Sequence, residues 1–152
     1  KGKAANDSKW VAIGPIAIGS NEGATDFFIT SDSVSSSILK PLRSKAKNKI
    51  VVEVRRLDHY SKELKENVTR MLKLDVQGSE YDCISSAGNS INKFSFIQME
   101  TSISPLYKGE KNYIEMIELM REKMFKPIFF YPGVYNEAKE IIQLEIFFSK
   151  DK

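Results

Sequence analysis

Short apolar runs separated by stretches of helical spacing mark the chain between residues 70 and 131. The runs are bounded by polar residues and glycines and are predicted to be strands, over residues 70–76, 94–99 and 126–131. Apolar side chains at helical spacing predict helices over residues 79–87 and 112–124, the second capped by Asn112. Strands that alternate with helices in this way are typical of an α/β sheet with parallel neighbours.

The flanking parts of the chain follow a strand pattern interrupted by turns. Residues 10–18 form an apolar run with a bend, and residues 25–30 and 50–57 are predicted to be strands that pair antiparallel around a serine-rich loop. Residues 59–68 are expected to form a short helix. The last strand, residues 141–148, follows its predecessor with no helix between them, so it is expected to be antiparallel. The aromatic residues of the last two strands are expected to pack in the core.

The composition is that of an ordinary globular protein. Hydrophobic residues make up 41% and charged residues 28% of the 152 residues, so we expect one domain, residues 1–152, with one core. The net charge of +3 and the lack of an arginine-rich stripe predict no nucleic-acid partner. No apolar run reaches the roughly 18 residues of a membrane span, so no membrane partner is expected. The single cysteine, Cys83, cannot form an intrachain disulfide, which suits a cytoplasmic location.

The segment richest in chemical information is residues 72–82, which read LKLDVQGSEYD. A buried strand is expected to deliver Asp75 to its C-terminal end, where Gly78 permits a tight turn and Glu80 opens a helix. Ligands of open α/β sheets bind beyond the carboxyl ends of strands, so Asp75, Gln77 and Glu80 stand where a ligand is expected. The structural alternative is that Asp75 caps the turn and Glu80 lies near the positive end of the helix. The residues alone leave both possibilities open.

This segment resembles the signature of the FkbM methyltransferases, which reads Lys-Ile-Asp-Val-(Glu or Gln)-Gly-(Ala or Ser)-Glu. Further stretches resemble the family in the same order along the chain, namely PIAIGSNEGATDFFIT, the serines at 35–37, VRRLD, FIQMETS with Glu100, and ISPLYKGEKNY. Each stretch is short, but their order and spacing together cover nearly the whole chain.

The resemblance implies a Rossmann-like class I methyltransferase sheet with strand order 3-2-1-4-5-7-6, mostly parallel with an antiparallel last strand. Residues 10–18 correspond to strand 3 and residues 70–76 to strand 4. Strands 1 and 2, with the glycine-rich cofactor loop, have no counterpart in the sequence, and since the chain begins at Lys1 we expect them upstream. An incomplete domain of this kind exposes an unpaired edge at strand 4, through which self-association is possible.

The resemblance also implies the cofactor and the site residues. The cofactor is S-adenosyl-L-methionine, expected to contact Ala17, Ile18, Asp75, Gln77 and Gly78. Two of these residues lie in the Ala-Ile-Gly turn and three in the signature.

Catalysis on the acceptor side is expected from Asp75, Glu80 and Glu100, and no metal site is expected. Asp75→Asn and Glu80→Gln are each expected to reduce methyl transfer far more than stability. The implied function is O-methylation of a hydroxyl on a sugar or other small molecule, with the 152 residues inactive alone. The alternative is a non-catalytic α/β binding module or a degenerate methyltransferase remnant.

Overall fold

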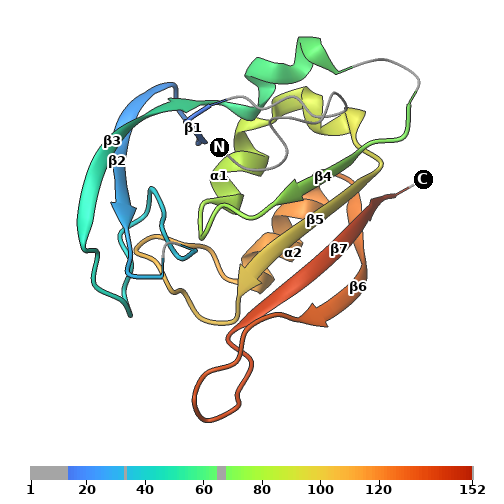
Figure 1. Ribbon diagram of the computed structural model, residues 1–152. Helices are drawn as coiled ribbons and strands as arrows, with labels where there is room; N and C mark the ends of the chain where they lie inside the picture. Colours follow the sequence, from blue (N-terminus) through green and yellow to red (C-terminus); the bar gives the residue numbers. More distant parts are fainter. Residues whose placement is uncertain (1–13, 33, 65–67, 152) are drawn as a thin grey trace, which may run out of the picture.

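Two β-sheets lie side by side in the computed structural model, which describes residues 14–32, 34–64 and 68–151 (Figure 1). The first sheet has the order β1-β3-β2, with strands β1 (Ile16–Ile18), β2 (Gly23–Ile29) and β3 (Asn48–Arg55). The second sheet has the order β4-β5-β7-β6, with strands β4 (Met71–Leu74), β5 (Phe96–Ser102), β6 (Phe125–Pro132) and β7 (Gln143–Lys150). The fold is therefore mixed α/β, as predicted.

The four-stranded sheet confirms the strand pairs predicted for residues 70–148. Met71 stands opposite Phe96 in the parallel pair β4–β5, and β7 runs antiparallel to both β5 and β6. The parallel pair requires a crossover, which the helix α1 (Glu80–Ser86) and the 3₁₀ helix η3 (Gly88–Lys93) supply. The order β4-β5-β7-β6 is the one expected for the last four strands of the family sheet.

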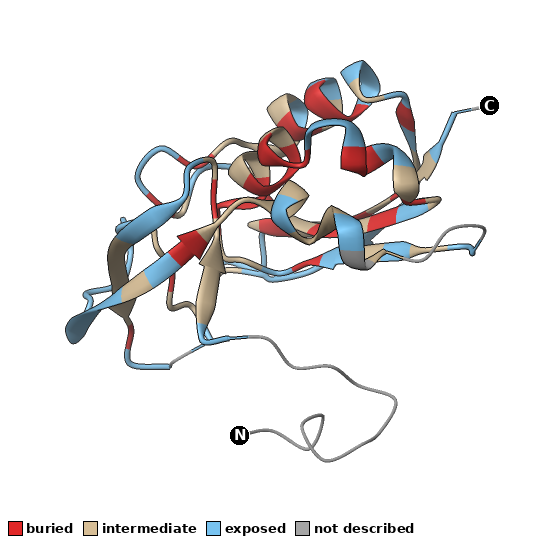
Figure 2. Cartoon of the chain, turned by 90° about the horizontal axis from the view of Figure 1, so that it is seen from above, coloured by how far each residue is buried: buried red, intermediate tan, exposed pale blue. Residues whose placement is uncertain are grey.

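The core lies between the four-stranded sheet and two helices, α1 and α2 (Tyr113–Glu122). Strand β5 alternates between buried and partly exposed positions, and its buried Ile97 and Met99 stand opposite Phe148 and Ile146 of β7. Figure 2 shows the buried residues on the helices and on the sheet beneath them. As predicted, Asn112 caps α2, since its side chain accepts the backbone N–H groups of Ile114 and Glu115.

The three-stranded sheet stands apart from this core. Strands β2 and β3 pair antiparallel, as predicted for the strands around the serine-rich loop. Strand β1 pairs in parallel with β3, with Ile16 opposite Glu53, and this pair was not predicted. The expected class I sheet, mostly parallel and with strand 3 in the same sheet as strand 4, is therefore not confirmed. Three of the five strand pairs among the described residues are antiparallel. Within the described part of the chain β4 pairs only with β5, so its other edge has no strand neighbour.

Several element boundaries differ from those predicted. Strand β5 ends at Ser102 and not at residue 99, so Glu100 lies within the strand, opposite Glu145. The short helix expected over residues 59–68 is the 3₁₀ helix η2 (Leu57–Glu63), and residues 65–67 lie outside the described part, as do residues 10–13.

The prediction of a buried aromatic cluster is wrong for β6. Phe129, Phe130 and Tyr131 of this edge strand are 55%, 47% and 59% exposed, whereas Phe125 at its beginning is buried. Phe148 of β7, which lies between two strands, is fully buried. No helix within residues 14–32, 34–64 and 68–151 is long and apolar enough to cross a membrane.

Candidate functional site

The turn that follows β4 has a backbone that only certain residues tolerate. Gln77 and Gly78 both have positive φ angles, 52° and 96°. A Cβ on Gly78 would lie 2.8 Å from Cδ2 of Tyr107, whose ring covers the turn. Glycine at this position is therefore required both by the left-handed backbone and by the close approach of the tyrosine.

Glu80 holds this turn from inside. Its side chain is buried, and its two carboxylate oxygens accept the backbone N–H groups of Val76 and Gly78, each at 3.0 Å. Burial raises the pKa of Glu80 to about 7, although the bonds from these N–H groups act in the opposite direction. Because both oxygens already serve the turn, the geometry favours the structural alternative for Glu80.

Asp75 and Glu100 meet across the ends of β4 and β5 through one amide. Nε2 of Gln77 donates to Oδ1 of Asp75 at 2.9 Å and to Oε2 of Glu100 at 3.2 Å. The same Oε2 accepts Nε2 of Gln143 at 2.9 Å. Partial burial raises the pKa of Glu100, and the negative charge of Asp75 raises it further. The structure thus places two of the three predicted catalytic carboxylates, those of Asp75 and Glu100, on either side of the Gln77 amide, which bonds to both.

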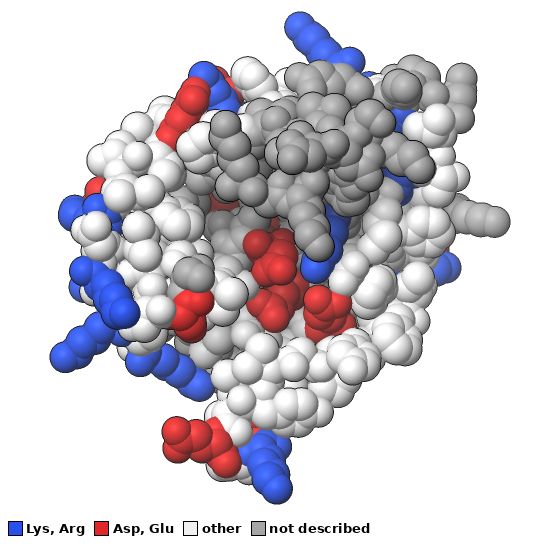
Figure 3. All heavy atoms as spheres, in the orientation of Figure 1, with Lys and Arg blue, Asp and Glu red and all other residues white. Residues whose placement is uncertain are grey.

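A third carboxylate, that of Glu145, belongs to the strand beside Glu100. Glu145 of β7 stands opposite Glu100 in the strand register, and its carboxylate accepts the side-chain amide of Gln98. Figure 3 shows acidic side chains gathered in a hollow at the centre of the face seen in Figure 1. Among the described residues, no three potential metal ligands lie close enough together to hold an ion.

Tyr107 connects the serine-rich loop to the turn. Its hydroxyl lies 3.0 Å from the Ser35 carbonyl oxygen and 3.0 Å from Oε1 of Gln77, so its single hydrogen is shared between these two acceptors. The backbone N–H of Tyr107 is in turn held by the buried carboxylate of Glu110, at 2.9 Å. Tyr107 thereby fixes which end of the Gln77 amide faces the carboxylates.

Ser37 is a second connection that sequence reasoning missed. It is buried, and its hydroxyl donates to the Gln77 carbonyl oxygen at 2.6 Å, a contact that the sequence did not predict for the serine-rich loop. The signals for these contacts were the serine run and the Pro-Leu-Tyr stretch, both of which matched the family pattern without any assigned role. No sequence signal indicated Gln143.

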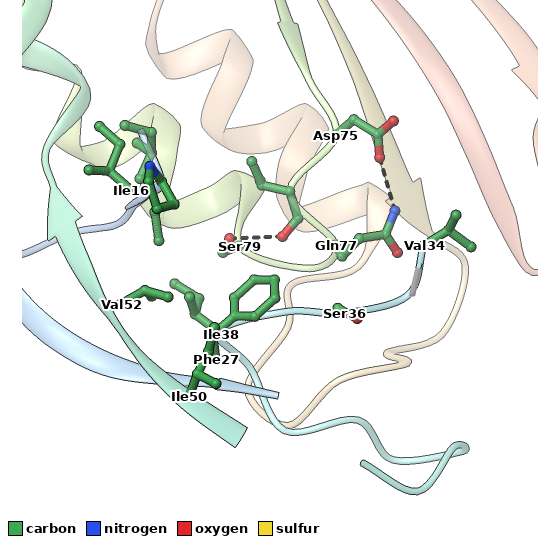
Figure 4. Close-up of a pocket in the computed structure, with 14 residues that line it drawn as sticks. Ile16, Phe27, Val34, Ser36, Ile38, Ile50, Val52, Asp75, Gln77 and Ser79 are labelled. Atoms are coloured by element: carbon green, nitrogen blue, oxygen red, sulfur yellow. Dashed lines mark hydrogen bonds between the residues drawn. The ribbon is translucent and has the colours of Figure 1, made fainter. Parts of the chain in front are cut away.

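A pocket of about 390 Å³ opens between the two sheets (Figure 4). Four of the five residues predicted to bind the cofactor line this pocket: Ala17 and Ile18 on β1, and Asp75 and Gln77 after β4. The fifth, Gly78, lies in the turn against Tyr107. Residues more than fifty positions apart in the sequence therefore face one cavity.

The family is decided by a comparison with protein-family models. The model described as the methyltransferase FkbM domain matches residues 7–127, about four-fifths of the chain. This chain belongs to the FkbM methyltransferase family. The match contains β1, the turn after β4, Glu100 and Tyr107, while Gln143 and Glu145 of this FkbM chain lie beyond it. No curated protein and no solved structure matches the chain.

Proposed function

We propose that this FkbM chain takes part in the transfer of a methyl group from S-adenosylmethionine to a hydroxyl of a small molecule. The observation that carries the proposal is the pocket between the sheets, where Ala17 and Ile18 face Asp75 and Gln77. These residues come from the two stretches that most resemble the family, and the family match contains both of them.

The pocket residues fit two parts of this cofactor. Apolar residues of β1, among them Ile16 and Ala17, suit a flat adenine ring, and Asp75 offers a carboxylate to a cationic centre. When bound, S-adenosylmethionine supplies an activated methyl group on a positively charged sulfur. The sequence contains no strand–glycine–helix loop to hold the carboxylate of its methionine part. We therefore propose that the 152 residues alone bind the cofactor weakly and do not turn over.

Asp75 and Glu100 have the acceptor-side role in this proposal. Each accepts a hydrogen bond from the Gln77 amide, and each retains oxygen lone pairs to which an acceptor hydroxyl can donate. Because partial burial raises the pKa of Glu100, its carboxylate is a stronger base than an exposed one, which favours it as the proton acceptor. Glu80 keeps the turn in place and is a positioning residue.

Two measurements test this function. Calorimetric titration of the 152-residue chain with S-adenosylmethionine is expected to give binding weaker than about micromolar, because the hydrogen bonds of the glycine loop are lacking. In a chain extended upstream by that loop, Asp75→Asn and Glu100→Gln are each expected to lower methyl transfer about 100-fold or more. Asp26→Asn, which removes a surface ion pair with Lys49, is the control and should leave transfer unchanged.

One observation favours a second candidate, a non-catalytic binding module or degenerate methyltransferase. The 152 residues contain no glycine-rich loop. Without such a loop the pocket lacks part of the cofactor site. The same assays separate the two candidates. An extended chain that binds S-adenosylmethionine but transfers no methyl group to any hydroxyl offered would support the binding module and contradict the transferase.

A further inference from the structure

One wall of the pocket is built from apolar side chains of the three-stranded sheet. Phe27 of β2 stands opposite Ile50 of β3, and Val52 follows two positions later on the same face. Ile38 from the loop between these strands completes the wall, which Figure 4 shows as one group of side chains. Ile50 is 46% exposed, so the wall is apolar surface that the protein leaves open to a ligand.

The opposite wall carries the polar groups of the pocket beside Val34 and Val76. Asp75, Gln77, Ser36 and Ser79 line it, and Figure 4 shows Asp75 and Gln77 across the cavity from the group that contains Phe27 and Ile50. The Asp75 side chain is 52% exposed, with Lys73 at 3.8 Å and the Gln77 amide at 2.9 Å as its partners. A carboxylate only accepts hydrogen bonds, so this wall selects a ligand group that donates them, such as a hydroxyl.

The two walls together describe one kind of molecule. We propose that this pocket binds an amphipathic acceptor, with a hydroxyl-bearing head against Asp75 and Gln77 and an alkyl or aromatic body against Phe27, Ile50 and Val52. The proposal rests on the proposed function for the reaction that follows binding, and it narrows the substrate class from any hydroxyl compound to an amphiphile. Phe27, Ile50 and Val52 are then specificity-determining residues.

Binding without cofactor tests this directly on the 152-residue chain. The probes are n-octyl β-D-glucoside, kept below its micelle concentration, and methyl β-D-glucoside, which has the same head and no apolar body. We expect the octyl glucoside to bind at least about tenfold more tightly, because its chain is removed from water at the apolar wall. Titration followed by amide chemical shifts measures both affinities and locates the perturbed residues.

A matched pair of variants separates the wall from nonspecific apolar adsorption. Ile50→Thr should weaken the octyl glucoside about fivefold or more and leave the methyl glucoside unchanged, because only the apolar contact is removed. Val51→Thr, the next residue along β3 and 71% exposed, lies outside the pocket lining and should have no effect. Since both positions are exposed, neither variant should unfold the protein, and thermal unfolding of each checks this.

Four results would overturn the proposal. The first is equal affinity for the two glucosides, and the second is that Val51→Thr weakens octyl glucoside binding as much as Ile50→Thr does. The third is that Phe129→Ser on the exposed β6 abolishes binding. The fourth is that adenosine displaces the octyl glucoside, which would assign the wall to the cofactor. None of these measurements involves methyl transfer. A failure here therefore leaves the proposed reaction standing, and loss of transfer in the Asp75 and Glu100 variants is judged separately.

Discussion

The two sheets of this FkbM-family chain differ in how they are stabilised. Every buried member of the hydrophobic core lies between Leu74 and Phe148, in the four-stranded sheet and the helices on it. The three-stranded sheet has one buried strand residue, Val54. The comparison shows that one sheet has a core of its own, while the other depends on contacts at its boundary.

Those boundary contacts include the packing of Ile18 against the core and several hydrogen bonds. The Cys83 thiol donates to the Ile18 carbonyl oxygen at 3.6 Å, and the Leu57 N–H donates to the Ser86 hydroxyl at 3.2 Å. Ser37 donates to the Gln77 carbonyl oxygen. The candidate site lies at this boundary, so its geometry depends on the joint between the sheets and not on either sheet alone.

The largest effect is expected from matched substitutions in the two sheets. Ile146→Ala removes a fully buried side chain from the core and should lower the free energy of unfolding by about 2–5 kcal/mol. Ile50→Ala removes the same atoms from a position that is 46% exposed and should cost less than about 1 kcal/mol. Urea denaturation of both variants measures the difference. Equal costs would mean that the three-stranded sheet has a core that the burial pattern does not show.

The next effect is a pH dependence centred on Glu80. Its pKa is raised from 4.5 to about 7 in the folded protein, so the folded state binds this proton more tightly than the unfolded chain. The stability due to this group is complete below pH 4.5 and is lost as the pH rises towards 7, by about 2–3 kcal/mol over that window. Unfolding measured from pH 4.5 to 8 reports the loss.

Glu80→Gln isolates this contribution, because the amide has the same shape and does not titrate. The difference in unfolding free energy between wild type and Glu80→Gln should change through the window. The difference for Glu115→Gln should not, since the ion pair with Lys111 lowers the pKa of Glu115. If the difference in unfolding free energy between wild type and Glu80→Gln does not change from pH 4.5 to 8, the Glu80 carboxylate stays ionised in this range. A charged group would then hold the turn.

A smaller effect is expected at the joint, from Gly78→Ala. The substitution meets both a left-handed backbone, φ 96°, and the Tyr107 ring at 2.8 Å, and should cost about 2 kcal/mol. Gly109→Ala is the control, because Gly109 has a similar φ of 86° with nothing within 4 Å. Its cost of about 1 kcal/mol represents the backbone alone. Thermal unfolding measures both costs. If the two variants lose the same stability, the Tyr107 ring does not restrict residue 78.

The sequence predicted the four-stranded half of the fold better than the other half. Local periodicity was sufficient there, because residues 70–148 alternate strands with helices that bury one face, and Asn112 caps the second α-helix. The separate three-stranded sheet depends on the parallel pairing of β1 with β3, a contact between residues 37 positions apart such as Ile16 and Glu53. No periodic pattern encodes which edge a short strand joins, and the aromatic composition of β6 predicted burial for side chains that are exposed.

The site shows the same division. Asp75 and Gln77 were predicted because they sit beside a glycine at a strand end, which is a local signal. The burial of Glu80 and the contacts made by Ser37, Tyr107 and Gln143 arise from tertiary packing. The sequence alone did not decide whether Glu80 faces a ligand or has a structural role. Its hydrogen bonds from the backbone N–H groups of Val76 and Gly78 favour the structural role.

The smallest expected effect addresses the joint through a single hydroxyl. Ser37→Ala removes the buried bond to the Gln77 carbonyl and should lower the free energy of unfolding by about 1 kcal/mol. Ser35→Ala is the matched control, because its hydroxyl bonds the exposed Asp32 side chain and its loss should cost less than about 0.5 kcal/mol. Hydrogen exchange gives the sharper measurement. If Ser37 ties the small sheet to the large one, the Ser37 variant should speed exchange in β2 and β3 while leaving β5 and β7 unchanged. Equal acceleration in both sheets would mean that they unfold as one unit, and the comparison between them would fail.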